Sequence, residues 1–126
     1  MKNLKSALSQ KSESKSVDGS SSIVCASIRE GSPTLVVIAW EGRRWVMPWV
    51  HFLYAWHEYE EKFERIEMRF SSHDISLEGI RLERLLEHLS KYNVERIRSS
   101  DKRYLNQCPQ DLPFIEKIKV KDKNLE

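Results

Sequence analysis

The chain has 126 residues, of which 40% are hydrophobic and 32% charged, and its formal net charge is +2 at pH 7. This length suits one domain with a single hydrophobic core. A charge so close to zero excludes strong attraction of nucleic acid or anionic membranes by the whole molecule, so such binding would need a local patch. The longest apolar run, residues 35–40, is far shorter than the ~20 residues of a membrane-spanning helix.

Composition divides the chain into a tail, a folded part and a short end. Residues 1–21 are rich in serine and lysine and predict a disordered tail, because few apolar side chains are present to offset the entropy of ordering. Residues 22–121 predict a single α+β domain, and residues 122–126 predict a frayed C-terminus. Cys25 and Cys108 lack any metal-binding or redox spacing, so we expect two free thiols in a cytoplasmic protein without a membrane partner.

Residues 23–28 are a β-branched run that predicts a first strand, and residues 34–49 predict a hairpin. Two strand-like runs flank Glu41 and Gly42, and a two-residue loop that contains glycine is a typical hairpin connection. This register pairs Ile38 with Trp45 and Val36 with Met47. Because side chains alternate along a strand, one face of the hairpin would hold Val36, Ile38, Trp40, Trp45, Met47 and Trp49.

The middle of the chain predicts three more strands. Residues 51–59 suit a strand better than a helix, because their apolar side chains would spread around a helix without forming a stripe. Residues 64–70 and 73–77 each alternate apolar and polar side chains and predict a hairpin.

The period then changes from two to nearly four. Leu82, Leu85, Leu86 and Leu89 follow the spacing of an amphipathic helix, which we expect over residues 80–92. Residues 94–100 predict a strand, and residues 114–120 a last strand or helical turn. The predicted fold is therefore α+β, a mainly antiparallel sheet or open barrel with one long amphipathic helix.

The sequence contains no recognisable catalytic or metal-binding motif. Gly-x-Ser-x-Gly elbows, glycine-rich phosphate loops and zinc-ligand spacings are absent, and adjacent carboxylates such as Glu60 and Glu61 lie in a highly charged stretch. His57 and Glu61 would be close on a helix, but two ligands alone indicate a surface pair rather than a metal site. We expect no enzyme activity, no metal and no cofactor.

One short box has a counterpart in a known family. Arg65 and Arg69 precede Asp74-x-Ser76-x-x-Gly79, an order that resembles the cyclic-dinucleotide signature of PilZ domains. The resemblance covers about fifteen residues and implies that the arginines grip phosphates while Asp74 and Ser76 read guanines. The alternative is a structural junction, in which the four polar residues form a solvent face and Gly79 lets a strand turn into the helix. The close spacing, with both arginines inside a strand, favours the junction.

Two surfaces remain as candidates for function. The first is the tryptophan face, where Trp40, Arg43, Trp45, Met47 and Trp49 would bind a partner protein or a second copy of the chain. The second is a C-terminal basic stripe for single-stranded nucleic acid, which requires the last two strands to pair and combines Arg96, Arg98, Lys117, Lys119 and Lys121. We rank the interaction module first, nucleic-acid binding second and a degenerate PilZ-like receptor third.

Overall fold

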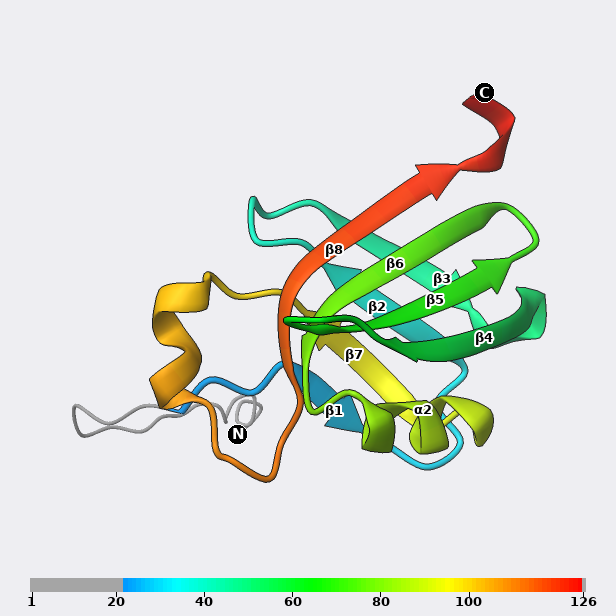
Figure 1. Cartoon of the computed structure of the whole chain (residues 1–126). Coiled ribbons are helices and arrows are strands. Elements are labelled where there is room, and N and C mark those ends of the chain that lie inside the picture. The colour runs from blue at the N-terminus through cyan, green and yellow to red at the C-terminus, as the bar shows by residue number, and fades with distance from the viewer. Residues whose placement is uncertain (1–21, 126) are drawn as a thin grey trace, which may run out of the picture.

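The computed structural model describes residues 22–125, which form eight strands, one α-helix and three short 3₁₀ turns. Figure 1 shows their arrangement. The strands are β1 Ala26–Ile28, β2 Thr34–Ile38, β3 Arg44–Pro48, β4 Phe52–Tyr59, β5 Glu64–Phe70, β6 His73–Ile80, β7 Val94–Arg98 and β8 Phe114–Asp122. The helix is α2 Glu83–Ser90, and the 3₁₀ turns are η1 Trp49–His51, η2 Lys102–Gln107 and η3 Lys123–Leu125. The predicted disordered tail lies outside the described residues.

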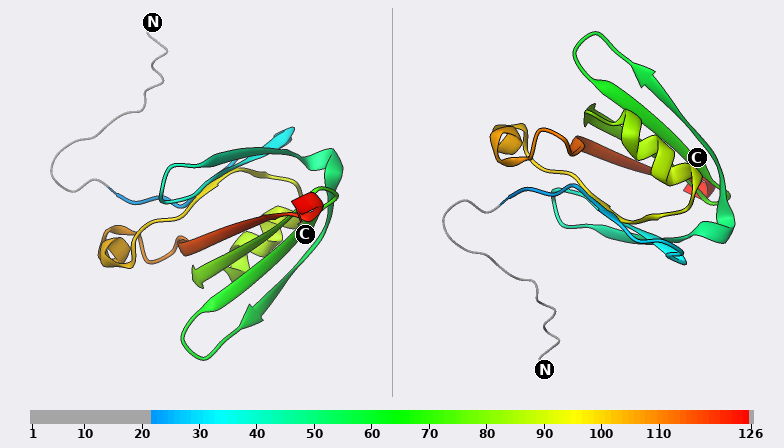
Figure 2. Two further views of the ribbon diagram at one scale, coloured as in Figure 1. Left: turned by 90° about the horizontal axis from the view of Figure 1, so that it is seen from above. Right: turned by 90° about the horizontal axis from the view of Figure 1, so that it is seen from below.

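The strands form two four-stranded sheets rather than one. One sheet has the order β1-β7-β2-β3 and the other β4-β5-β6-β8. Neighbouring strands are antiparallel except β2 and β7, which pair in parallel. In Figure 2 the sheets form two layers that meet at the corner between β3 and β4 and diverge away from it, with α2 between them.

The predicted α+β fold with one long amphipathic helix is wrong, because the described chain is mostly strand and α2 has only eight residues. Arg81 has φ 58° and Tyr92 has φ 57°, and this left-handed conformation ends a right-handed helix on either side. Leu82 is therefore the N-cap residue and lies outside the helix. The helix makes only about two turns and contains only part of the leucine pattern. The helix packs against β4 and β7, one strand of each sheet.

The predicted register of the β2–β3 hairpin is also wrong by one residue. Val37 lies opposite Trp45 and Leu35 opposite Met47, and residues 39–43 form the loop. A two-residue loop of type I′ needs positive φ at both of its positions, which Glu41 as a non-glycine residue resists. In the longer loop only Gly42 has positive φ (105°), and the backbone N–H of Ala39 donates to the carbonyl of Arg43.

The remaining predicted strands are found in the structure, and their apolar sides fill one core. Residues 52–59 are a strand, as predicted, and β5 and β6 form the predicted hairpin. Residues 122–125 continue β8 into η3, and the N–H of Lys123 donates to the carbonyl of Ser72. The fully buried side chains come from both sheets and from α2, and the largest are Phe70, Leu35, Ile66, Met68, Ile75, Leu77, Leu82, Leu85, Leu89, Ile97 and Ile115.

Gly79 has a packing role instead of the predicted turning role. It lies in β6 at an irregularity of the β6–β8 pairing, and a Cβ built there would lie 1.9 Å from the carbonyl oxygen of Phe114. The residue that turns the chain from β6 towards α2 is Arg81, which has positive φ.

We therefore expect Gly79→Ala to lower the free energy of unfolding by about 2–3 kcal/mol, because the close approach of β8 must be relieved by moving backbone. The matched change Gly42→Ala meets open space and should cost only the strain of a positive φ, about 1 kcal/mol. Urea unfolding of both variants tests this. Equal losses would contradict the packing role.

Candidate functional site

The four residues of the PilZ-like box come together on the outer face of the second sheet. Arg65 lies opposite Glu78, and Arg69 lies opposite Asp74 across the β5–β6 hairpin, while Ser76 lies opposite Glu67. The lysines of β8 extend this face, which we call the ion-pair face and define as Arg65, Glu67, Arg69, Asp74, Ser76, Glu78, Lys117, Lys119 and Lys121.

Carboxylates on this face and in the loop before β5 already bind both arginines. The Arg65 guanidinium lies 3.2 Å from Glu78 and 3.3 Å from Glu60, and the hydrogen bond to Glu78 raises the pKa of Arg65. The Arg69 guanidinium lies 3.0 Å from Glu67. These distances describe a surface whose charges neutralise one another across the strands.

The other polar groups of the box are engaged in the same way. Asp74 is shared between Arg69 at 3.6 Å and Lys123 at 3.4 Å, and Ser76 donates a 2.6 Å hydrogen bond to Glu67. A phosphate approaching the arginines would have to displace Glu67 and Asp74 and then lie beside them. The geometry therefore favours the polar-face part of the junction interpretation over a cyclic-dinucleotide site.

The five residues of the predicted tryptophan face do not form one surface. Met47 and Trp49 are buried in the core, with exposed fractions of 4% and 5%, and the Trp49 indole N–H donates to the carbonyl of Val94. Trp45 is partly buried below the Arg43 guanidinium. Trp40 lies in the loop, half-exposed, with its ring 5.9 Å from that of Tyr104. The register explains the difference in part, because it places Trp45 and Met47 beside the fully buried Val37 and Leu35 and not beside Ile38 and Val36.

We expect Trp49→Ala to lower the free energy of unfolding by about 3–5 kcal/mol, because a buried ring and its hydrogen bond are lost. Trp40→Ala, which removes a half-exposed ring from the same segment, should cost less than about 1 kcal/mol. Denaturant unfolding measures both. If Trp49→Ala lowered the free energy of unfolding only slightly, the result would contradict the burial of Trp49 and support the predicted exposed interface.

The predicted basic stripe is divided between the two sheets. Arg96 and Arg98 lie on β7 in the first sheet, whereas Lys117, Lys119 and Lys121 lie on β8 in the second. The condition for the stripe, pairing of these two strands, is not met. The lysines share a face with Asp74, Ser76 and Glu78 of β6, and the arginines join a different surface.

That surface is the outer face of the first sheet. Two rows of neighbouring residues run across β7, β2 and β3. The first row is Arg96, Val36 and Val46, and the second is Arg98, Ile38 and Arg44. Laterally paired side chains point to the same side of a sheet, so arginines and aliphatic side chains alternate over it. We call it the arginine face and define it as Val24, Val36, Ile38, Arg44, Val46, Arg96 and Arg98. It carries a shallow hollow of about 660 Å³.

The arginine face differs from the ion-pair face in its charge balance. The guanidinium groups of Arg44, Arg96 and Arg98 make no ion pair or hydrogen bond within residues 22–125, and all three residues are exposed. Val46 is 63% exposed and Val24 45%. Figure 2 shows that no described helix or strand covers this side of the first sheet. The assumed hairpin register placed Val36 and Ile38 with the tryptophans, so sequence reasoning missed that they lie beside Arg96 and Arg44.

A third cluster lies where β6 leads into α2. Both oxygens of the Glu64 carboxylate accept backbone hydrogen bonds, from Leu82 at 2.9 Å and Arg81 at 2.8 Å, and one oxygen lies 2.9 Å from Nε2 of His57. Burial favours the neutral carboxyl, but these hydrogen bonds outweigh it and lower the pKa of Glu64. The carboxylate fixes the turn before the helix, near the positive end of the helix dipole.

This cluster gives a pH dependence with a defined sign. Because the folded pKa of Glu64 lies below its ordinary value of 4.5, the stabilisation is present above that value and is lost as the pH falls through the folded pKa. Glu64→Gln should cost about 1–2 kcal/mol at pH 7, and the difference from the native protein should shrink below pH 4.5. Thermal melts from pH 7 to about pH 3 measure it. Glu61→Gln, at an exposed position, is the control, and a pH-independent difference would contradict this role.

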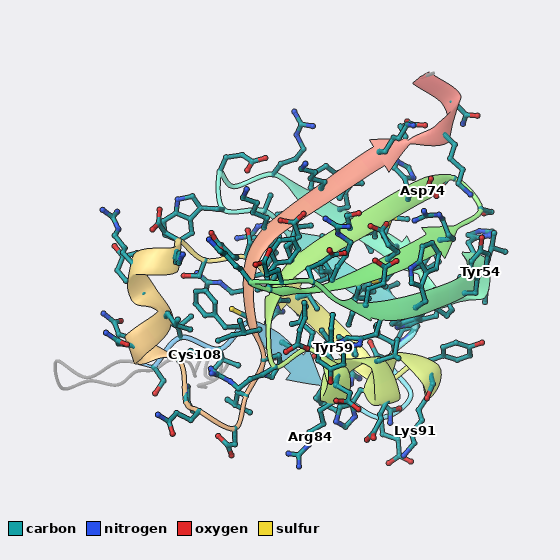
Figure 3. The ribbon with its side chains drawn as sticks, in the orientation of Figure 1. Tyr54, Tyr59, Asp74, Arg84, Lys91 and Cys108 are labelled. Atoms are coloured by element: carbon teal, nitrogen blue, oxygen red, sulfur yellow. The ribbon has the colours of Figure 1, made fainter. Side chains whose placement is uncertain are left out.

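A polar cleft of about 300 Å³ lies beside this cluster, in the region where Figure 3 labels Tyr59 on β4 and Arg84 on α2. Tyr59 donates a hydrogen bond to Glu83 there. Arg81 is held by the carbonyls of Leu112 and Pro109. Among residues 22–125 no three histidine, cysteine, aspartate or glutamate side chains are arranged to hold a metal ion.

The two cysteines are unpaired and buried, in agreement with the prediction of free thiols. Burial raises the pKa of the Cys25 thiol, which disfavours the reactive thiolate. No helix within the described range is long and apolar enough to cross a membrane. No family model, curated protein or solved structure matches the chain.

Proposed function

We propose that the protein is a non-enzymatic interaction module that binds an acidic segment of a partner protein on its arginine face. The observation that carries the proposal is the set of three exposed arginines, Arg44, Arg96 and Arg98, whose guanidinium groups make no ion pair or hydrogen bond within the described residues. They lie on a sheet face that is otherwise aliphatic. On such a face the arginines can bind carboxylates of a partner, and the aliphatic residues can contact apolar side chains of the same partner.

The contrast between the two outer faces supports this assignment. On the ion-pair face, Arg65 and Arg69 are bound by glutamates and an aspartate of neighbouring strands. On the arginine face, Arg44 and Arg98 lie two strands apart with Ile38 between them, about 10 Å across. Like charges at this spacing repel, and an acidic ligand removes that repulsion when it binds.

The same charges argue against a second copy of the chain as the occupant. Two arginine faces brought together would bury six guanidinium groups without carboxylates, at a large electrostatic cost. We therefore assign the predicted docking role to a foreign partner, and we place it on the arginine face instead of the tryptophan face. An extended partner segment that alternates acidic and apolar residues turns all its carboxylates to one side, so that side of the segment can face the three arginines.

The composition of the face also favours protein over single-stranded nucleic acid. Sheets that bind single strands stack bases on aromatic side chains between their basic residues. The arginine face contains valine and isoleucine at these positions and no aromatic side chain. The stacked pair of exposed Tyr54 and partly buried Trp56 lies on β4 in the other sheet, where the Arg69 guanidinium covers the Trp56 ring at 4.8 Å.

Two further parts of the proposal follow from the described residues. The absence of enzyme activity is supported by His57 and Glu64, a histidine–carboxylate pair whose carboxylate is committed to backbone N–H groups of the turn before α2. A cytoplasmic location is supported by Cys25 and Cys108, which are buried and unpaired.

The test is a calorimetric titration of the protein with a ten-residue peptide that alternates glutamate with valine. The titration is carried out at low and at physiological salt. We expect saturable binding that weakens with salt. The double variant Arg96→Glu/Arg98→Glu should weaken it at least about tenfold. The matched variant Lys117→Glu/Lys119→Glu makes the same change of charge on the ion-pair face and should weaken it less than about twofold.

Three outcomes would overturn the proposal. The first is an equal loss in the two double variants, which would mean a general charge effect. The second is a lysine–valine peptide of the same length that binds as tightly as the acidic one. The third is oligo-dT that binds more tightly than the acidic peptide and depends on Arg96 and Arg98, which would assign the face to nucleic acid.

A further inference from the structure

The arginine face extends onto β1 through Ser27. In the β1–β7 register Ser27 lies opposite Arg96, so the two side chains point to the same side of the sheet. The preceding Ala26 lies opposite Ile97, which is fully buried in the core. Ser27 also lines the hollow of the arginine face. The first row of this face therefore begins with a hydroxyl group on β1.

The Ser27 hydroxyl is available to a ligand. Within residues 22–125 it makes no hydrogen bond. Its oxygen also keeps accessible surface, because it is not one of the buried side-chain oxygens that lack a partner, whereas the hydroxyl of Ser100 is. A serine hydroxyl can donate one hydrogen bond to an anion. The hollow thus presents a neutral donor beside the unpaired guanidinium group of Arg96.

Ser27, Arg96 and Arg98 occupy neighbouring positions. Arg96 and Arg98 are two residues apart on the same face of β7, so their Cα atoms are about 7 Å apart. The Cα atom of Ser27 is about 5 Å from that of Arg96 across the paired strands. Arg44 is farther away, because Ile38 lies between it and Arg98. The donors are therefore concentrated at the β1–β7 side of the hollow, where the long arginine side chains can reach one anionic group together.

The charges around the hollow suit a doubly charged anion. Among the described residues that line it, three are arginines and none is acidic. Glu95 precedes Arg96 in sequence but pairs with Arg29 at 3.4 Å. A phosphate monoester carries about −1.5 to −2 charges at pH 7 and has three acceptor oxygens. Two guanidinium groups and one hydroxyl can bind all three oxygens, whereas a carboxylate offers two oxygens and a single charge.

We propose that the partner segment carries a phosphorylated serine or threonine, which binds at the β1–β7 side of the hollow. Arg96 and Arg98 bind the phosphate oxygens, and the Ser27 hydroxyl donates to one of them. An acidic residue of the same segment binds Arg44 on the other side of Ile38. This inference rests on the proposed function and names the group that anchors the segment. Arginine clusters recognise phosphorylated motifs in several families of interaction domain.

The test compares two ten-residue peptides by calorimetric titration at low salt. The first is the glutamate–valine peptide with one central glutamate replaced by phosphoserine. The second has the same total charge, because it keeps every glutamate and replaces one valine by a further glutamate. We expect the phosphopeptide to bind at least about tenfold more tightly than this charge-matched peptide. Inorganic phosphate should bind at least about tenfold more weakly than the phosphopeptide, because it does not reach Arg44 or the aliphatic side chains.

Ser27→Ala is the variant that separates the phosphate site from the rest of the face. It should weaken binding of the phosphopeptide about five- to tenfold and change the affinity for the charge-matched peptide less than about twofold. Ser76→Ala is the matched control, because it removes a hydroxyl that donates to Glu67 on the ion-pair face. It should change neither affinity. Circular-dichroism melts establish that both variants fold.

Three outcomes would overturn the inference. The first is a phosphopeptide that binds no more tightly than the charge-matched peptide. The second is a Ser27→Ala variant that leaves the ratio of the two affinities unchanged, and the third is inorganic phosphate that binds as tightly as the phosphopeptide. In the first case the proposed function still holds if the charge-matched peptide binds and depends on Arg96 and Arg98. If neither peptide binds, the proposed function fails as well.

Discussion

The sharp turn between Pro48 and Phe52 is the constraint on which the rest of the structure depends. There the chain leaves the first sheet through η1 and enters the second sheet as β4. The ring of Trp49 packs against those of Phe52 and Phe70, and its indole N–H is bound by the carbonyl of Val94 in β7. One side chain thus joins the corner, the second sheet and the returning strand, and it fixes which face of each sheet is buried.

Once the corner sets the buried faces, the charges are distributed unequally between the two outer faces. Antiparallel pairing of β5 with β6 places Arg65 beside Glu78 and Arg69 beside Asp74, so basic and acidic side chains neutralise each other. On the other side of the molecule, β7 inserts in parallel beside β2 and brings Arg96 and Arg98 next to aliphatic residues of the hairpin. The nearly neutral total charge of +2 conceals this difference.

Local patterns predicted those elements that depend on neighbouring residues alone. Alternation located the β5–β6 hairpin and the strand over residues 52–59. The helix was predicted too long because the leucine spacing does not reveal the left-handed conformations of Arg81 and Tyr92. The hairpin register failed because one glycine, Gly42, suited both a two-residue and a five-residue loop. The partners of β7 and β8 depend on contacts distant in sequence, so the division of the basic residues could not be predicted.

The most direct test of the account is a map of the bound acidic peptide on the protein by amide NMR shifts. The account predicts that the largest changes cluster on β7 and β2, at Val36, Ile38, Arg96 and Arg98, with smaller changes at Arg44 and Val46 of β3. The amides of β8 should remain unchanged. Changes centred on Lys117 and Lys119, or in the loop around Trp40, would contradict the claim that the unpaired arginines form the binding surface.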